Sequence, residues 1–156
     1  MSQLSFASLH RPAATQVGTF GGSQTERRSL DFVVDGISLY SEMRASHYDF
    51  IGLLGWCTYE QDLESVQRLL LEVPTNVGGG RQSLFVCAEC GDLGCGAITA
   101  AISNLGNRYV WADFAYENNY DAAMTDRESF ASIGPFEFEA SAYRRALVAA
   151  LETRRS

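Results

Sequence analysis

The feature that most restricts the fold is a run of apolar segments, broken by turn residues, between Leu84 and Asn118. Three segments in it are rich in β-branched, aromatic and small apolar residues: Leu84–Cys90, Cys95–Ser103 and Arg108–Tyr116. Glycine-containing stretches separate them, and Gly106 supplies the positive φ that a tight hairpin needs. The pattern predicts a three-stranded antiparallel meander.

The N-terminal part of the chain predicts a hairpin. Residues 1–12 are Ser-rich and end in Pro12, which is typical of a flexible N-terminus. The hairpin is expected to consist of Ala14–Phe20, a turn at Gly21–Ser23, and a second arm at Arg28–Val34. Asp35-Gly36 is a further turn signal.

Helices are predicted both before and after the meander in the chain. Ile37–Ala45 is a short helix with Ser38 as its N-cap, and Thr58–Val73 has the capping-box spacing of Thr58 and Gln61. An apolar stripe of Leu63, Val66, Leu70 and Val73 is expected to face the core. The closing helix is Ala140–Thr153, with a stripe of Tyr143, Leu147, Ala150 and Leu151.

The connections complete the picture. Ser46–Cys57 is expected to be an apolar loop or short strand, and residues 117–133 a polar loop or broken helix. Phe136–Phe138 predicts a short edge strand after a turn at Gly134-Pro135. We therefore expect a single α+β domain over residues 13–156, in which one antiparallel sheet, the hairpin plus the meander, is covered by the two longer helices.

Charge and composition exclude several classes of function. The net charge of −7 opposes binding to nucleic acid or to an anionic membrane, and favours a basic protein as partner. All twelve basic residues are arginine, which removes Schiff-base and P-loop lysine chemistry. No apolar run is long enough to span a membrane, and the first residues lack the pattern of a secretory signal, so a cytoplasmic location is expected.

Three of the four cysteines form the pattern C-x2-C-x4-C at Cys87, Cys90 and Cys95. Two thiolates on one knuckle chelate zinc, and a fourth ligand would come from Cys57, His47 or His10. In an unbroken strand Leu84–Cys90, however, Cys87 and Cys90 would point to opposite faces unless a turn begins near Ala88. A reversible thiol redox role and a purely structural role are the alternatives.

The third strand of the meander ends in acidic and polar residues. Period-two alternation places Tyr109, Trp111, Asp113 and Ala115 on one face, and Val110, Ala112, Phe114 and Tyr116 on an apolar core face. Aromatic and acidic side chains together are typical of a partner-binding site, here Trp111, Asp113, Tyr116, Glu117, Asn118 and Asp121. Asp113 and Glu117 as an acid/base pair, or an ordinary solvated sheet face, are the alternatives.

Groups for nucleophilic catalysis are scarce. The chain has two histidines, and a Cys57–His47 pair is the one Cys–His arrangement that the spacing suggests. There is no G-x-S-x-G motif, so a non-enzymatic protein is favoured.

The segments VCAECGDLGCGAIT, VWADFAYENNYD and GPFEFEASAY resemble an uncharacterised family of small bacterial proteins with a C-x-E-C-G-D-L-G-C-G hairpin, a W-x-D-F-x-Y-E-N strand and a G-P-F-x-F turn. The resemblance runs from about Asp31 to the end of the chain. Some members of that family are labelled oxidoreductases, but this chain has no nucleotide-binding fingerprint. Ala88 stands where the family usually has proline, which removes a rigid φ from the knuckle.

Two functions follow as hypotheses. The first is an acidic partner-binding protein, for instance an immunity protein that inhibits a co-encoded toxin through the acidic strand end. The second is a zinc-binding or thiol-redox protein that uses Cys87, Cys90 and Cys95, with Cys57 as an additional ligand.

Overall fold

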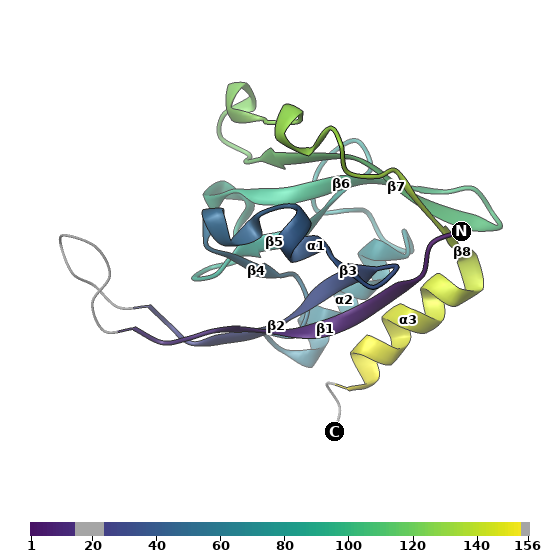
Figure 1. The fold of residues 1–156 in the computed structure, drawn as a ribbon, viewed down its shortest axis with the longest axis horizontal. Coiled ribbons are helices and arrows are strands. Elements are labelled where there is room, and N and C mark those ends of the chain that lie inside the picture. The colour runs from purple at the N-terminus through teal and green to yellow at the C-terminus, as the bar shows by residue number, and fades with distance from the viewer. Residues whose placement is uncertain (15–23, 154–156) are drawn as a thin grey trace.

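The computed structural model describes residues 1–14 and 24–153, which form two antiparallel sheets with helices beside them (Figure 1). One sheet contains β1 (Leu4–Arg11), β2 (Arg27–Val34) and β3 (Ile37–Ser38). The other contains β4 (Phe50–Gly52), β5 (Arg81–Cys87), β6 (Ala97–Asn104), β7 (Arg108–Glu117) and β8 (Phe136–Glu139), in that order. The helices are α1 (Leu39–Glu42), α2 (Tyr59–Leu69) and α3 (Ala140–Glu152).

The α+β class and the antiparallel meander are confirmed, but the predicted single sheet is wrong. Strands β5, β6 and β7 form the meander, which β4 and β8 extend into a five-stranded sheet. The N-terminal strands form a separate sheet of their own. Helices α2 and α3 pack against each other, and α3 also contacts β1, β7 and β8, so the helices flank two sheets (Figure 1).

The first strand lies where the sequence predicted a flexible N-terminus over residues 1–12. Strand β1 pairs with β2 from Leu4 opposite Val34 to Arg11 opposite Arg27. Leu4 and Phe6 alternate with Ser5 and Ala7, and this period-two signal was masked by the serine content. Strand β2 therefore pairs with Leu4–Arg11, and residues 15–20 of the predicted first arm Ala14–Phe20 lie outside the described residues. The predicted turn at Gly21–Ser23 lies outside the described residues.

The turn and helix after β2 follow the sequence signals. Asp35 and Gly36 both have positive φ, 53° and 79°, in a two-residue connection between β2 and β3. The side chain of Ser38 accepts a hydrogen bond from the Ser41 N–H and caps α1, as predicted. The helix is shorter than expected, because the chain leaves it through Arg44 at φ 53°.

The core lies between the two sheets and the helices. The Phe32 ring of β2 meets Phe85 and Trp111 of the large sheet edge-on, with ring centroids 5.8 and 5.5 Å apart. From α3, the Tyr143 hydroxyl donates to the Leu69 carbonyl at 2.6 Å and accepts from the Trp111 indole at 3.1 Å. These bonds join α2, α3 and β7 through one buried phenol. The predicted stripe of α3 is buried, whereas Leu63 of the predicted α2 stripe is 37% exposed.

Strand β4 passes so close to β2 that only glycine fits. A Cβ at Gly52 would lie 1.8 Å from the Leu30 carbonyl oxygen. The Gly52 N–H instead donates to the buried Ser29 hydroxyl at 3.1 Å. Gly52 therefore allows the two sheets to approach each other.

A bulge in β7 reverses the predicted faces of that strand. Thr99 pairs with Ala115 but Ala101 pairs with Ala112, so Asp113 and Phe114 together face one residue of β6. Asp113 adopts φ 52° at this point. The bulge turns both Trp111 and Phe114 into the core, although their odd separation predicted opposite faces.

Within the described ranges, the helices are too short and polar to cross a membrane.

Candidate metal centre

The cysteine-containing connection between β5 and β6 folds into a tight knuckle. Strand β5 ends at Cys87, and the Gly91 N–H then donates to the Cys87 carbonyl at 2.9 Å. The chain therefore turns from Ala88 onward, and Cys90 returns to the side of Cys87. In a strand that continued to Cys90, the side chains of Cys87 and Cys90 would point to opposite faces of the sheet. Because β5 ends at Cys87, they do not.

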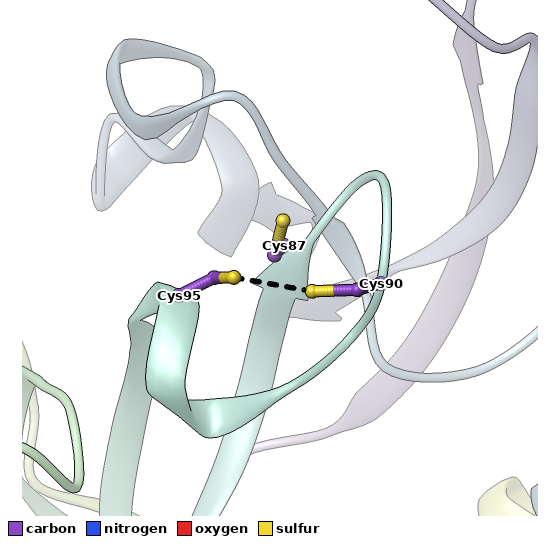
Figure 2. Close-up of side chains that lie close together, drawn as sticks. All are labelled: Cys87, Cys90 and Cys95. Carbon is purple, nitrogen blue, oxygen red and sulfur yellow. Dashed lines mark hydrogen bonds between the residues drawn. The ribbon is translucent and has the colours of Figure 1, made fainter.

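The three thiols converge at the open end of the knuckle. The sulfur atoms of Cys87, Cys90 and Cys95 all lie within 4.8 Å of one another, and those of Cys90 and Cys95 are 3.2 Å apart (Figure 2). Tetrahedral zinc with Zn–S bonds of about 2.3 Å holds its sulfurs about 3.8 Å apart. The cluster fits one ion with small adjustments.

The electrostatics of the knuckle favour one thiolate over the others. Burial raises the pKa of Cys87, but the N–H groups of Cys90 and Glu89 and the neighbouring thiols outweigh it, and the pKa is lowered. The pKa of Cys95 is raised to about 12, first by the hydrogen bond between Cys95 and Cys90 and then by the charge of Cys87. A bound cation would offset the repulsion between the charges of Cys87 and Cys95.

Two aromatic rings lie against glycines of the knuckle. A Cβ on Gly91 would lie 2.6 Å from the Trp56 ring, and one on Gly94 would lie 2.6 Å from the Tyr120 ring. Gly91 also has φ +69°, where a side chain is strained. Turn geometry and ring packing therefore explain Gly91, and ring packing explains Gly94.

Two arginines from the N-terminal sheet hold the knuckle in place. Arg27 donates to the carbonyls of Ala88 and Glu89 at 2.8 and 3.1 Å, and its guanidinium lies 5.3 Å from the centroid of the Trp56 ring. Arg11 bridges the carboxylates of Asp49 and Glu89 at 2.7 and 2.8 Å. Sequence analysis missed both arginines, because they lie more than 60 residues from the knuckle and no local pattern links them to it.

The predicted fourth ligands do not join the three sulfurs. In the part of the chain that the structure describes, no histidine, carboxylate or further cysteine belongs to the cluster. His10 pairs with Glu26 at 2.9 Å, and His47 lines a different cavity beside Tyr48. Cys57 lines a polar groove of about 400 Å³ that also reaches Cys90. Cys57 and His47 therefore line different cavities.

The predicted partner-binding residues separate into buried, paired and exposed groups. Trp111 is fully buried and cannot anchor a partner, which corrects that assignment. Tyr116 is half-buried and stacks on Tyr48 with centroids 5.1 Å apart. Asn118 is half-buried and Asp121 is exposed, and both cap local turns.

The two acids of the strand end are occupied by internal ion pairs. The Arg81 side chain, 9% exposed, donates to Asp113 at 3.0 Å and to Glu117 at 2.8 Å. Glu117 also accepts from the Thr99 hydroxyl, and Asp113 pairs with Arg127 at 3.0 Å. Sequence reasoning missed Arg81, which crosses β6 to reach both acids. A pair held in this way is poorly suited to acid/base catalysis, because both carboxylates are already bound to the same arginine.

Comparison with known proteins gave no match to a protein-family model, a curated protein or a solved structure.

Proposed function

We propose that the protein binds a zinc ion through the thiolates of Cys87, Cys90 and Cys95. The single observation that carries the proposal is the convergence of the three sulfur atoms within 4.8 Å, from a strand end, a turn and a short 3-10 helix. Soft thiolate ligands at this separation select zinc among the common divalent ions.

The organisation around the sulfurs supports the same proposal. The N–H groups against Cys87 stabilise a thiolate, and Arg27 orients the peptides that carry them. Outer partners that orient metal ligands in this way are typical of metal sites. Isolated structural thiols would not need such support.

The proposed centre has three protein ligands and one open coordination position. Cys90 and Cys95 are exposed, so water or an external ligand reaches the ion directly. Closed structural zinc sites have four protein ligands, whereas three plus an open position is the arrangement of sites that exchange ligands. The proposed function is therefore an accessible zinc centre.

Elemental analysis of purified untagged protein tests the proposal. We expect one zinc per chain in the wild type, a large loss of zinc in Cys87→Ser, and full retention in Cys57→Ser, which is the matched control outside the cluster. Folded wild-type protein that takes up no zinc from a zinc-containing buffer would reject the proposal.

Partner binding is a second candidate, favoured by one exposed surface next to the centre. Tyr120 is 81% exposed and Met124 is 56% exposed, with exposed Asp121 between them. Aromatic and Met side chains flanking an acid suit a basic protein partner, such as a toxin encoded beside this chain. Calorimetric titration of such a partner should show weaker binding for Tyr120→Ala and Asp121→Arg, and unchanged binding for Leu105→Ala on a distant exposed turn. Equal affinities in all variants would reject this surface.

A further inference from the structure

We infer that Cys90 and Cys95 form a reversible disulfide that competes with the metal for the same sulfurs. The inference rests on the proposed zinc centre and adds its regulation by oxidation. The sulfurs of Cys90 and Cys95 are already 3.2 Å apart, and both residues are exposed to solvent (Figure 2).

The loop between the two cysteines allows the bond to close. A disulfide has an S–S length of about 2.05 Å, so the sulfurs must approach by only about 1.2 Å. Gly91 and Gly94 lie in this loop, and the side chains of Cys90 and Cys95 point toward each other across it (Figure 2). Cys87 is less accessible, because it is half-buried at the end of β5 opposite Phe50.

A hydroperoxide is the oxidant that the exposed pair fits. One thiolate attacks a peroxide oxygen, the O–O bond breaks, and hydroxide or alkoxide leaves, which gives a sulfenic acid. The second thiolate attacks that sulfur, the S–S bond forms, and the S–O bond breaks with loss of hydroxide. The two sulfurs lose two electrons in total, the peroxide gains them, and the two thiol protons end on the oxygen products. A dithiol reductant reverses the reaction by thiol–disulfide exchange.

Oxidation and metal binding exclude each other in this geometry. The disulfide removes two of the three sulfur ligands, and Cys87 alone cannot hold the ion. Conversely, bound zinc occupies the lone pairs with which the thiolates attack the peroxide. Only the metal-free fraction then reacts, so zinc at 100 times its dissociation constant should slow disulfide formation about a hundredfold.

The experiment treats the full-length protein with hydrogen peroxide, with and without Zn²⁺, and locates the cross-link by mass spectrometry. Cleavage before Asp92 separates Cys90 from Cys95, and cleavage after Glu89 separates Cys87 from Cys90. We expect metal-free wild type to lose two of its four titratable thiols and to yield a Cys90–Cys95 cross-link. Dithiothreitol should restore all four thiols and the capacity to bind zinc.

Variants separate the parts of the inference. Cys87→Ser should lose zinc yet still form the Cys90–Cys95 cross-link, and Cys57→Ser should retain both properties. Cys90→Ser and Cys95→Ser should each abolish the cross-link, with far-UV circular dichroism confirming that the variants are folded. A cross-link through Cys87, or oxygen adducts without any cross-link, overturns the inference.

The outcomes also distinguish this inference from the proposed function. A protein that binds zinc but gives no Cys90–Cys95 cross-link overturns the inference and leaves the zinc centre intact. A cross-link that forms equally fast with and without bound zinc overturns the competition. A cross-link in a protein that takes up no zinc overturns the proposed zinc centre. It also overturns the proposed competition between disulfide formation and zinc binding.

Discussion

The Arg27 side chain reaches across from β2 and donates its Nε–H to the Ala88 carbonyl at 2.8 Å. A second nitrogen of the same guanidinium donates to the next carbonyl, that of Glu89, at 3.1 Å. With these two carbonyls fixed, the following N–H groups are directed toward the sulfur of Cys87. A residue of the small sheet therefore sets the shape of the knuckle in the large one.

Replacing Arg27 with alanine should weaken zinc binding about 10- to 100-fold, as is typical when an outer partner of a metal ligand is lost. The matched control is Arg28→Ala, which removes the same charge from the next residue of β2, where the side chain is 72% exposed. Competition with a chromogenic zinc chelator measures both affinities. Equal losses in the two variants would mean that charge, and not the pair of hydrogen bonds, is responsible.

Gly91→Ala should both destabilise the protein and weaken zinc binding. The new Cβ would lie 2.6 Å from the Trp56 ring, at a φ of +69°. Gly106→Ala isolates the backbone cost, because it has φ +92° with no atom within 4 Å, and it should cost about 1–2 kcal/mol. Urea unfolding should show a larger loss of unfolding free energy for Gly91→Ala than for Gly106→Ala. Chelator competition should show weaker zinc binding for Gly91→Ala alone.

Arg81→Met should cost about 3 kcal/mol of unfolding free energy, because it leaves Glu117 and Asp113 without their buried cation. Arg127→Met removes an arginine whose side chain is 54% exposed, and it should change stability by less than about 1 kcal/mol. Both values come from urea unfolding at neutral pH. Similar small effects for both variants would show that the Arg81 network contributes little.

Asp31→Asn should remove a pH dependence of stability. Asp31 is 3% exposed, and burial raises its pKa despite hydrogen bonds from the Ser38 hydroxyl and the Tyr40 N–H. A raised pKa means that the folded state binds this proton more tightly than the unfolded state does. The contribution to stability is therefore complete below the unfolded pKa and is lost as the pH rises through the folded pKa.

Asparagine imitates the protonated acid, with an acceptor for Tyr40 and a donor for Ser38. The variant should match the wild type below about pH 4 and exceed its stability at neutral pH. Urea unfolding midpoints across that range provide the check. Parallel pH profiles for the two proteins would contradict this role of Asp31.

Local signals in the sequence predicted many elements of the fold. Capping side chains at Ser38 and Thr58 marked the starts of α1 and α2, and the Asp35-Gly36 turn formed as expected. The arrangement of the strands was not predictable in the same way. The bulge at Asp113 and the pairing of Leu4–Arg11 with β2 depend on contacts between distant segments, which no local pattern contains.

The candidate site shows the same division. The spacing of Cys87, Cys90 and Cys95 predicted the cluster, because a tight turn keeps residues this close in the chain close in space. The supporting arginines and the neutralising Arg81 were missed, since a long side chain can reach partners on any neighbouring strand. The burial of Trp111 was missed because one bulge exchanges the faces of a strand.

X-ray absorption at the zinc K-edge of the zinc-loaded protein tests the central claim most directly. We predict three sulfur atoms at about 2.3 Å and one oxygen or nitrogen at about 2.0–2.1 Å around a single ion. Four sulfur atoms would show that Cys57 or another chain closes the site and would contradict the open position. A shell of oxygen and nitrogen without sulfur would contradict the cysteine centre altogether.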